Sequence, residues 1–152
     1  MEGLEQIIGK HPFFKGMSAA HIKLLSGCAK NVRFKKTAFI FREGEQANTF
    51  YCIRAGCVAL EFHTPNKGAT RFDYRKAGDV PGWSWLVAPH RWYSDACAVD
   101  DVRALAFDGA CLRGKWEDDS ELGYQMYKRF VPLICRSLQA TRLQLIDMYG
   151  AD

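Results

Sequence analysis

The middle of the sequence, from about residue 32 to residue 108, is a series of short β-prone runs separated by glycine-containing turns. The runs are VRF, AFIF, TFYCI, CVALEFH, TRFDY, ACAV and VRALAF, and they are rich in Val, Ile, Phe, Tyr and Thr. Gly44, Gly56, Gly68 and Gly78 stand between them. Short strands at regular spacing are typical of an antiparallel sandwich or barrel. The pattern therefore predicts a β-roll of about eight strands.

Two neighbouring runs have the pattern of a β-hairpin. In CVALEFH, the side chains of Val58, Leu60 and Phe62 fall on one face of a strand, because successive residues point to opposite faces. The segment TPNKGA then supplies turn residues. We expect Phe72 and Tyr74 of the returning strand to match the same inward face.

Helical periodicity flanks the β-prone region on both sides. LEQIIGKHPFF and MSAAHIKLLSGCAKN precede it, and Ser18 is a candidate N-cap of the second helix. DSELGYQMYKRF and LICRSLQATRLQLIDMYG follow it, and Pro132 predicts a break near Val131. The expected fold is mainly β, a jelly-roll-like antiparallel β-roll with N-terminal helices and two C-terminal helices at about 119–149.

Length and composition point to one globular domain over residues 1–152. The net charge of +4 is too small to indicate the dense basic face of a nucleic-acid-binding protein. No apolar run reaches the ~20 residues of a membrane span, and the N-terminus lacks the pattern of a signal peptide. We therefore expect a cytoplasmic protein that contacts neither DNA nor a membrane.

The cysteines and histidines do not form a recognisable metal motif. The six cysteines contain no CxxC pair, so we expect them to be reduced and mostly structural. The four histidines stand alone in the sequence, without further ligands at metal-binding spacing. The sequence predicts no metal site.

An unusual concentration of aromatic residues lies just past the middle of the chain, in AGDVPGWSWLVAPHRWYSDACA at residues 77–98. Tryptophan and tyrosine contribute large apolar surfaces together with a polar group that needs a partner. The cluster is either an aromatic part of the core or the floor of a binding pocket.

Two segments, IFREGEQANTFYCIRAGCVAL and AGDVPGW, resemble the cyclic-nucleotide-binding domain of the catabolite-activator (Crp/Fnr-like) superfamily. The matching residues are Phe41, Arg42, Glu43, Gly44, Glu45, Ala47, Phe50, Tyr51, Ile53, Gly56, Val58, Gly78, Asp79 and Gly82. Glu45 replaces the usual Asp. The likeness extends over residues 5 to 149 and implies a β-roll that carries a phosphate-binding cassette.

The resemblance also identifies candidate ligand-binding residues. In the family, backbone N–H groups after the cassette glycine receive the cyclic phosphate, a Glu next to that glycine holds the ribose, and an Arg pairs with the phosphate. Here Trp83 stands at the Glu position, and Trp92 or Tyr93 stands at the Arg position, with Arg91 adjacent. The candidates are Gly82, Trp83, Ser84, Trp85, Arg91, Trp92, Tyr93 and Ser94, with Thr141 and Arg142 of the last helix at the positions that reach the base.

This departure leaves two interpretations of the cassette. Trp83 has no acceptor for a ribose hydroxyl, and its indole can fill a cavity of nucleotide width. A filled pocket, or a pocket for a different ligand, follows from that substitution. Alternatively, the N–H groups after Gly82 still receive an anion, with Arg91 turned toward it.

The function expected from this resemblance is that of a non-catalytic regulatory or sensor module that does not bind cyclic AMP in the usual way. An alternative is a true receptor for a cyclic nucleotide or another anionic ligand, which signals through the C-terminal helix. A remote alternative is a cupin-like metal enzyme that uses His63 and His90. A redox sensor with a haem or a reactive thiol, such as Cys52 or Cys57, is a further possibility.

The last helix suggests how the chain assembles. Ile134, Leu138, Thr141, Leu145 and Met148 form a stripe with a period near 3.5 residues, as in a coiled coil. The stripe predicts a homodimer, or else it packs on the chain's own barrel. The other expected partners are a small anionic ligand and an unidentified protein. The chain ends at Asp152, which leaves no room for a helix-turn-helix domain and predicts no DNA binding.

Overall fold

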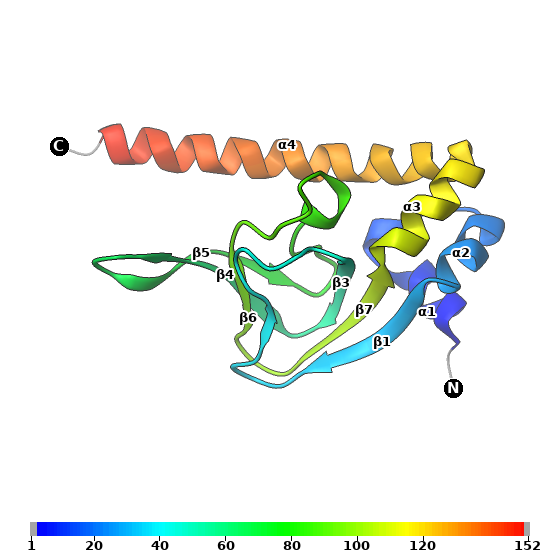
Figure 1. Ribbon diagram of the computed structural model, residues 1–152, viewed down its shortest axis with the longest axis horizontal. Coiled ribbons are helices and arrows are strands. Elements are labelled where there is room, and N and C mark those ends of the chain that lie inside the picture. The colour runs from blue at the N-terminus through cyan, green and yellow to red at the C-terminus, as the bar shows by residue number, and fades with distance from the viewer. Residues whose placement is uncertain (1–2, 151–152) are drawn as a thin grey trace.

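The computed structural model describes residues 3–150 and has a β-roll flanked by helices at both ends (Figure 1). The helical elements are α1 (Leu4–Lys10), η1 (Pro12–Phe14), α2 (Ala19–Ser26), η2 (Ser84–Leu86), α3 (Gly109–Asp118) and α4 (Ser120–Gly150). The strands are β1 (Ala29–Phe34), β2 (Phe39–Phe41), β3 (Thr49–Ala55), β4 (Cys57–Thr64), β5 (Gly68–Lys76), β6 (Asp95–Ala98) and β7 (Val102–Asp108). The expected fold class is confirmed, with seven strands among the described residues instead of about eight.

The strands form two antiparallel sheets with the orders β1-β7-β3 and β2-β6-β4-β5. Glycine makes the tight connection between β3 and β4 possible. Gly56 has a φ of 91°, and a Cβ atom there would collide with the carbonyl oxygen of Asp101 in the neighbouring turn. A residue with a side chain would be both strained and too large at this position.

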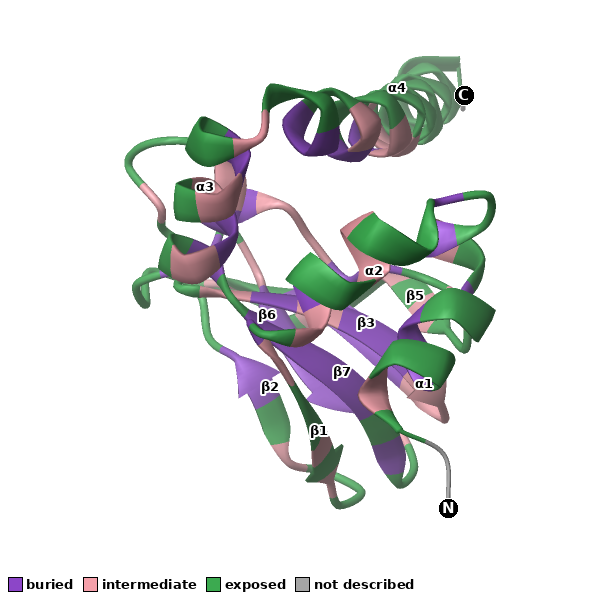
Figure 2. Ribbon diagram, turned by 90° about the vertical axis from the view of Figure 1, so that its right-hand side faces the viewer, coloured by how far each residue is buried: buried purple, intermediate pink, exposed green. Residues whose placement is uncertain are grey.

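The three-stranded sheet packs its outer face against the helices. Phe14 of η1, Leu25 of α2 and Phe130 of α4 are fully buried in the same core cluster as Phe50 and Phe107 of the sheet. Figure 2 shows the buried stretches of β3, β6 and β7, with the exposed outer faces of α1, α2 and α3 around them. Apolar burial of this kind is the main force that attaches the helices to the roll.

The C-terminal helix does not break at Pro132, contrary to the prediction of two helices that meet near Val131. α4 runs continuously from Ser120 to Gly150 and contains Pro132 (Figure 1). Fully buried Met126 and Phe130 anchor the helix before the proline, and partly buried Leu133 packs on the core after it. A proline inside a helix removes one hydrogen bond and crowds the carbonyl oxygen four residues earlier, and packing on both sides offsets this cost here.

The boundary between the two C-terminal helices lies instead at Asp119. This residue follows α3, and its carboxylate accepts a hydrogen bond from the backbone N–H of Leu122 at 3.1 Å. It therefore caps the start of α4. The C-terminal helical region consists of α3 and α4, and it begins ten residues before the expected position of about 119.

The β4–β5 hairpin extends beyond the roll, so the prediction that its aromatic residues face inward is wrong. Phe62, Phe72 and Tyr74 are 38%, 37% and 48% exposed. The pairing register shifts between Leu60 and Glu61, which interrupts the simple alternation of faces. Phe62 and Phe72 instead contact each other, with ring centroids 5.4 Å apart.

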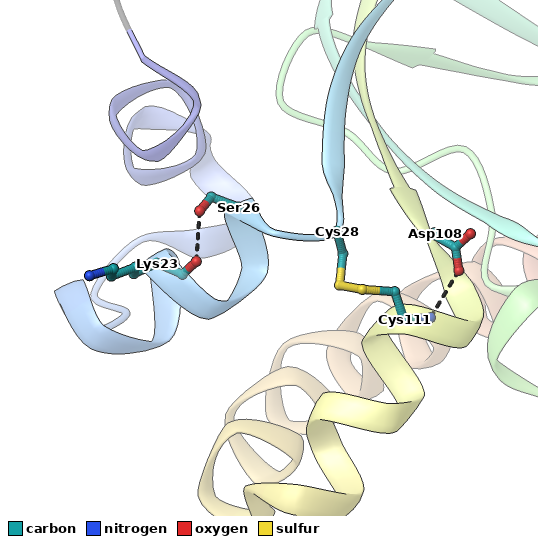
Figure 3. The surroundings of a disulfide bond; sticks show 5 residues. All are labelled: Lys23, Ser26, Cys28, Asp108 and Cys111. Atoms are coloured by element: carbon teal, nitrogen blue, oxygen red, sulfur yellow. Dashed lines mark hydrogen bonds between the residues drawn. A yellow bond between two sulfur atoms is a disulfide. The ribbon is translucent and has the colours of Figure 1, made fainter.

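A disulfide joins Cys28 to Cys111, so the expectation that all six cysteines are reduced is wrong for this pair (Figure 3). Cys28 lies between α2 and β1, and Cys111 lies in the first turn of α3. The two are 83 residues apart in the sequence, but β1 and β7 pair so that Ala29 is opposite Phe107. Strand pairing therefore brings them together, which the spacing of the cysteines in the sequence did not indicate.

A buried histidine attaches the N-terminal segment to the roll. His11 Nδ1 accepts a hydrogen bond from the N–H of Phe13 at 3.2 Å, so Nε2 carries the proton and donates to the carbonyl oxygen of Ile53 at 2.8 Å. Burial lowers the pKa of His11 below its usual 6.5. The folded protein therefore favours the neutral ring.

This histidine makes stability depend on pH. Because the pKa is lower in the folded state, the unfolded chain binds the proton more readily, and the free energy of unfolding should fall as the pH drops below about 6.5. We expect the urea midpoint of the protein to be lower at pH 5.5 than at pH 7.5. In the variant His11→Gln this difference should be smaller, and an equal difference in both proteins would contradict the assignment.

Candidate functional site

The segment that follows β5 forms the cassette turn, which we define as residues 77–94. It contains the short helix η2 and is attached to the loop between β2 and β3. In this attachment Gly44 N–H donates to the carbonyl oxygen of Trp92 at 2.9 Å, and Trp92 N–H donates to that of Glu45 at 3.1 Å. A further bridge pairs Gln46 with Arg91. The cassette turn is therefore fixed by backbone hydrogen bonds as well as by side chains.

Trp92 occupies the interior of the roll beneath the cassette turn. Its indole is 5% exposed and stacks on the ring of Phe41, with centroids 3.7 Å apart and planes at 6°. Gly82 lies directly against it, since a Cβ atom at Gly82 would be 3.2 Å from the ring of Trp92. The sequence analysis assigned the filling role to Trp83, but the residue inside the roll is Trp92.

Trp85 points to the other side, into the core between the sheet and the helices. It is fully buried, and its ring lies 5.1 Å from Phe50, 5.5 Å from Trp116 and 5.6 Å from Phe130. Its carbonyl oxygen accepts a hydrogen bond of 2.7 Å from Arg113 of α3. Trp85 therefore joins the cassette turn to α3 and α4.

The other candidates of the cassette turn are spread over different environments. Arg91 is exposed and donates to the carbonyl oxygen of Gly44 at 3.1 Å. Tyr93 is 72% exposed, Ser94 is partly buried and Ser84 is buried. The structure does not bring these side chains together around one space.

A cavity of about 250 Å³ lies between β5, the cassette turn and α4. Trp83 is the one predicted residue among those that line it, and Asp73, Arg75, Asp79, Arg136 and Ser137 supply most of its polar groups. The positions on α4 are Leu133, Arg136, Ser137 and Ala140, which share one helix face because their spacing is i, i+3, i+4 and i+7. This spacing could have identified the four residues from the sequence as one face of a helix.

The charges around this cavity are unevenly compensated. Arg75 donates to the carboxylate of Asp73 at 2.6 Å and to the carbonyl oxygen of Val80 at 3.3 Å. Asp79 accepts from the backbone N–H of Lys76 at 2.8 Å. Within the part of the chain that the structure describes, Arg136 makes no hydrogen bond or ion pair. The guanidinium of Arg136 is therefore the cation that remains available to an anionic ligand.

Thr141 and Arg142 lie further along α4, beyond this cavity, and both are exposed. The hydroxyl of Thr141 donates to the carbonyl oxygen of Ser137 at 3.0 Å. Nearby, Gln144 reaches the hairpin and donates to the carbonyl oxygen of Phe72 at 3.4 Å. The second half of α4 thus has a polar contact with the protruding β4–β5 hairpin.

Residues 3–150 contain no group of three or more His, Cys, Asp or Glu side chains arranged to hold a metal ion. In the same range, none of the helices combines the length and the apolar character that crossing a bilayer requires.

The profile of the cyclic nucleotide-binding domain family matches residues 31–119. No curated protein sequence matches the chain significantly. Among solved structures, the chain is similar to a putative cyclic nucleotide-binding protein from Geobacter metallireducens GS-15, with 22% identity, a TM-score of 0.78 and coverage of 91% of this chain and 99% of that chain.

In two further similar structures, the match covers only part of a longer chain. The catabolite activator protein of Thermus thermophilus has 19% identity and a TM-score of 0.73, with coverage of 91% of this chain and 63% of that chain. The regulatory subunit of a cAMP-independent protein kinase A from Trypanosoma brucei has 18% identity and a TM-score of 0.66, with coverage of 88% and 45%. At these identities the similarity establishes a common fold.

Replacing Trp92 tests its position inside the roll. Trp92→Ala should lower the free energy of unfolding by about 3–5 kcal/mol, because it removes a large buried ring and leaves a cavity. Tyr93→Ala removes the neighbouring exposed ring and should change stability by no more than about 0.5 kcal/mol. Urea denaturation followed by circular dichroism compares the two, and equal losses would place Trp92 outside the core.

Proposed function

The chain belongs to the cyclic nucleotide-binding domain family, and from this premise we propose that it is a non-catalytic regulatory module that does not bind cyclic AMP in the family's usual way. The observation that carries the proposal is the stack of Trp92 on Phe41 inside the roll. The family's proteins act by binding and conformational change, and the proposed module acts in the same way.

Two features of the cassette turn support the proposal about cyclic AMP. Trp83 offers an indole N–H and no acceptor at the position of the ribose-binding Glu. Arg91 is held by the carbonyl oxygen of Gly44 on the outer loop, so it does not supply the phosphate partner. Losing one charged partner at a buried polar contact typically costs about 2–5 kcal/mol, and here two such partners are missing.

We place the ligand in the cavity between β5 and α4 and infer that it is a small anion. Arg136 supplies a cation without a partner among the described residues, and Trp83 supplies an aromatic wall. A ligand there touches both the roll and α4, so it can favour one position of the helix over another. The Trypanosoma brucei relative, whose kinase is described as cAMP-independent, is a precedent for this fold in such a protein.

We also propose that the protein is a homodimer formed through α4. Tyr124, Tyr127, Val131, Ile134, Leu138, Thr141, Leu145 and Met148 follow the alternating 3,4 spacing of a coiled-coil seam. Leu138, Leu145 and Met148 are 50%, 49% and 75% exposed in the single chain, so the second half of this stripe leaves much apolar surface uncovered, while Ile134 packs partly on the chain's own core. Burying it against a second copy would remove a large exposed apolar surface.

The proposal about the ligand predicts different results for two compounds. Titration calorimetry with cyclic AMP should show no binding at micromolar concentrations, because both usual polar partners are missing. Inorganic pyrophosphate, used as a simple anionic probe, should bind, and Arg136→Ala should weaken its binding about tenfold or more, since a charged hydrogen bond is lost.

The matched control for that experiment is Lys128→Ala, which removes a cation from the same helix outside the cavity and should leave pyrophosphate affinity unchanged. Micromolar affinity for cyclic AMP would show a working nucleotide site and overturn the proposal. Equal losses in both variants would mean that the probe responds only to net charge.

The dimer can be tested with two substitutions on the same helix. Leu138→Asp places a charge in the middle of the seam and should give a monomer in light scattering at concentrations where the parent is a dimer. Leu143→Asp is the control, because Leu143 is 62% exposed but lies off the stripe. A monomeric parent protein at tens of micromolar would contradict the prediction.

A further inference from the structure

We propose that Cys28–Cys111 is a reversible thiol–disulfide site, and that its oxidation state controls how firmly α3 and the cassette turn are held. The inference stands on the position of the bond between two separate parts of the structure. It does not depend on which ligand occupies the cavity beside α4.

The disulfide can be reached from solvent. It borders a surface cavity of about 460 Å³, which Lys30, Thr49 and Asp108 also line (Figure 3 shows the surroundings of the bond). Cys111 itself is partly exposed. The thiol of Cys52 is a contrast, because it is fully buried and burial raises its pKa well above the usual value. A small dithiol can therefore approach Cys28–Cys111 while Cys52 stays protected.

Reduction leaves the roll itself intact. The N–H of Asp108 donates to the carbonyl oxygen of Cys28 at 2.9 Å, and β1 stays paired with β7. The carboxylate of Asp108 still caps α3 by accepting from the N–H of Cys111 at 2.9 Å (Figure 3). What the disulfide adds is a covalent link between the first turn of α3 and the segment that enters β1.

Two contacts carry the effect from α3 to the cassette turn. Arg113 lies two residues after Cys111 and donates to the carbonyl oxygen of Trp85 at 2.7 Å. One turn further on, the ring of Trp116 lies 5.5 Å from that of Trp85. If α3 is held less firmly, η2 is therefore held less firmly as well. Within η2, the N–H of Leu86 donates to the carbonyl oxygen of Trp83.

The chemistry is ordinary thiol–disulfide exchange with a dithiol reductant. A thiolate of the reductant attacks one sulfur of the disulfide, breaks the S–S bond and forms a mixed disulfide, while the other cysteine leaves as a thiolate and takes up a proton. The second thiol of the reductant then resolves the mixed disulfide. Cys28 and Cys111 gain two electrons and two protons, and the reductant becomes a disulfide. Reversible disulfides are often redox-sensing when they occur in reducing compartments.

The first experiment is a titration of the folded protein with dithiothreitol, followed by alkylation and peptide mass mapping. Cys28 and Cys111 should become alkylated together without denaturant, while Cys52 remains unmodified. A disulfide that is reduced only in denaturant would overturn the proposal.

The second experiment is hydrogen exchange of the oxidised and the reduced protein. We expect the amides of α3 and of Leu86 to exchange at least tenfold faster after reduction, and those of β7 to be unchanged. The double variant Cys28→Ser/Cys111→Ser should have the exchange rates of the reduced protein, and these rates should not change when dithiothreitol is added. If that variant does not fold, the reduced parent protein provides the same comparison.

Two further variants separate the proposed route from a general loss of stability. Cys135→Ser changes an exposed free cysteine on α4 and should keep the full response to dithiothreitol. Arg113→Gln should keep the response of α3 but reduce that of Leu86, because it removes the hydrogen bond to Trp85 and leaves only the ring contact of Trp116. Exchange rates in α3 that are equal in the oxidised and reduced protein would overturn the proposal.

Discussion

The structure depends on an aromatic cluster centred on Phe50 of β3. Phe50 is fully buried, and rings from four other segments surround it: Phe13 and Phe14 of η1, Trp85 of the cassette turn, Phe107 of β7 and Phe130 of α4. Aromatic pairs at these distances each add about 0.5–1.5 kcal/mol beyond the burial of their surface. The N-terminal segment, the three-stranded sheet, the cassette turn and α4 therefore share one packing unit. A displacement of one of them changes the contacts of the others, since interiors of this density transmit strain.

Two of the three tryptophans of the cassette turn, Trp92 and Trp85, enter different parts of the hydrophobic core. Trp92 enters the roll, where it stacks on Phe41, and Trp85 enters the aromatic cluster around Phe50. Glycine at position 82 permits the first placement, since any side chain there would press on the indole of Trp92. The answer to the question that the sequence raised, core or pocket, is that these two rings are core. The cavity lies beside them, where Trp83 meets α4.

The sequence was sufficient to predict the fold, because glycine turns and residue alternation act locally and the family motif fixes the order of the strands. It was insufficient wherever a contact between distant residues decides the outcome. α4 continues through Pro132 because packing at Phe130 and Leu133 outweighs the lost hydrogen bond and the steric crowding of the proline ring. Cys28 meets Cys111 only through the pairing of β1 with β7. The cavity was missed because most of its charged residues come from β5 and the middle of α4, whereas the sequence motif draws attention to residues 82–94.

Because α4 is continuous, its two proposed roles, lining the ligand cavity and forming the dimer, are linked. Its residues Leu133, Arg136, Ser137 and Ala140 line the cavity, and Leu138 and Leu145 point to a different face that stays exposed. Cavity-lining and exposed positions alternate along the same turns of α4. A ligand that moves the cavity-lining face must therefore also move the exposed face. A helix broken at Pro132 would separate its anchored first part from the cavity-lining residues and from the part of the seam that follows the proline. In an unbroken helix, a change in how α4 sits on the roll alters the geometry that it offers to a second copy of the chain.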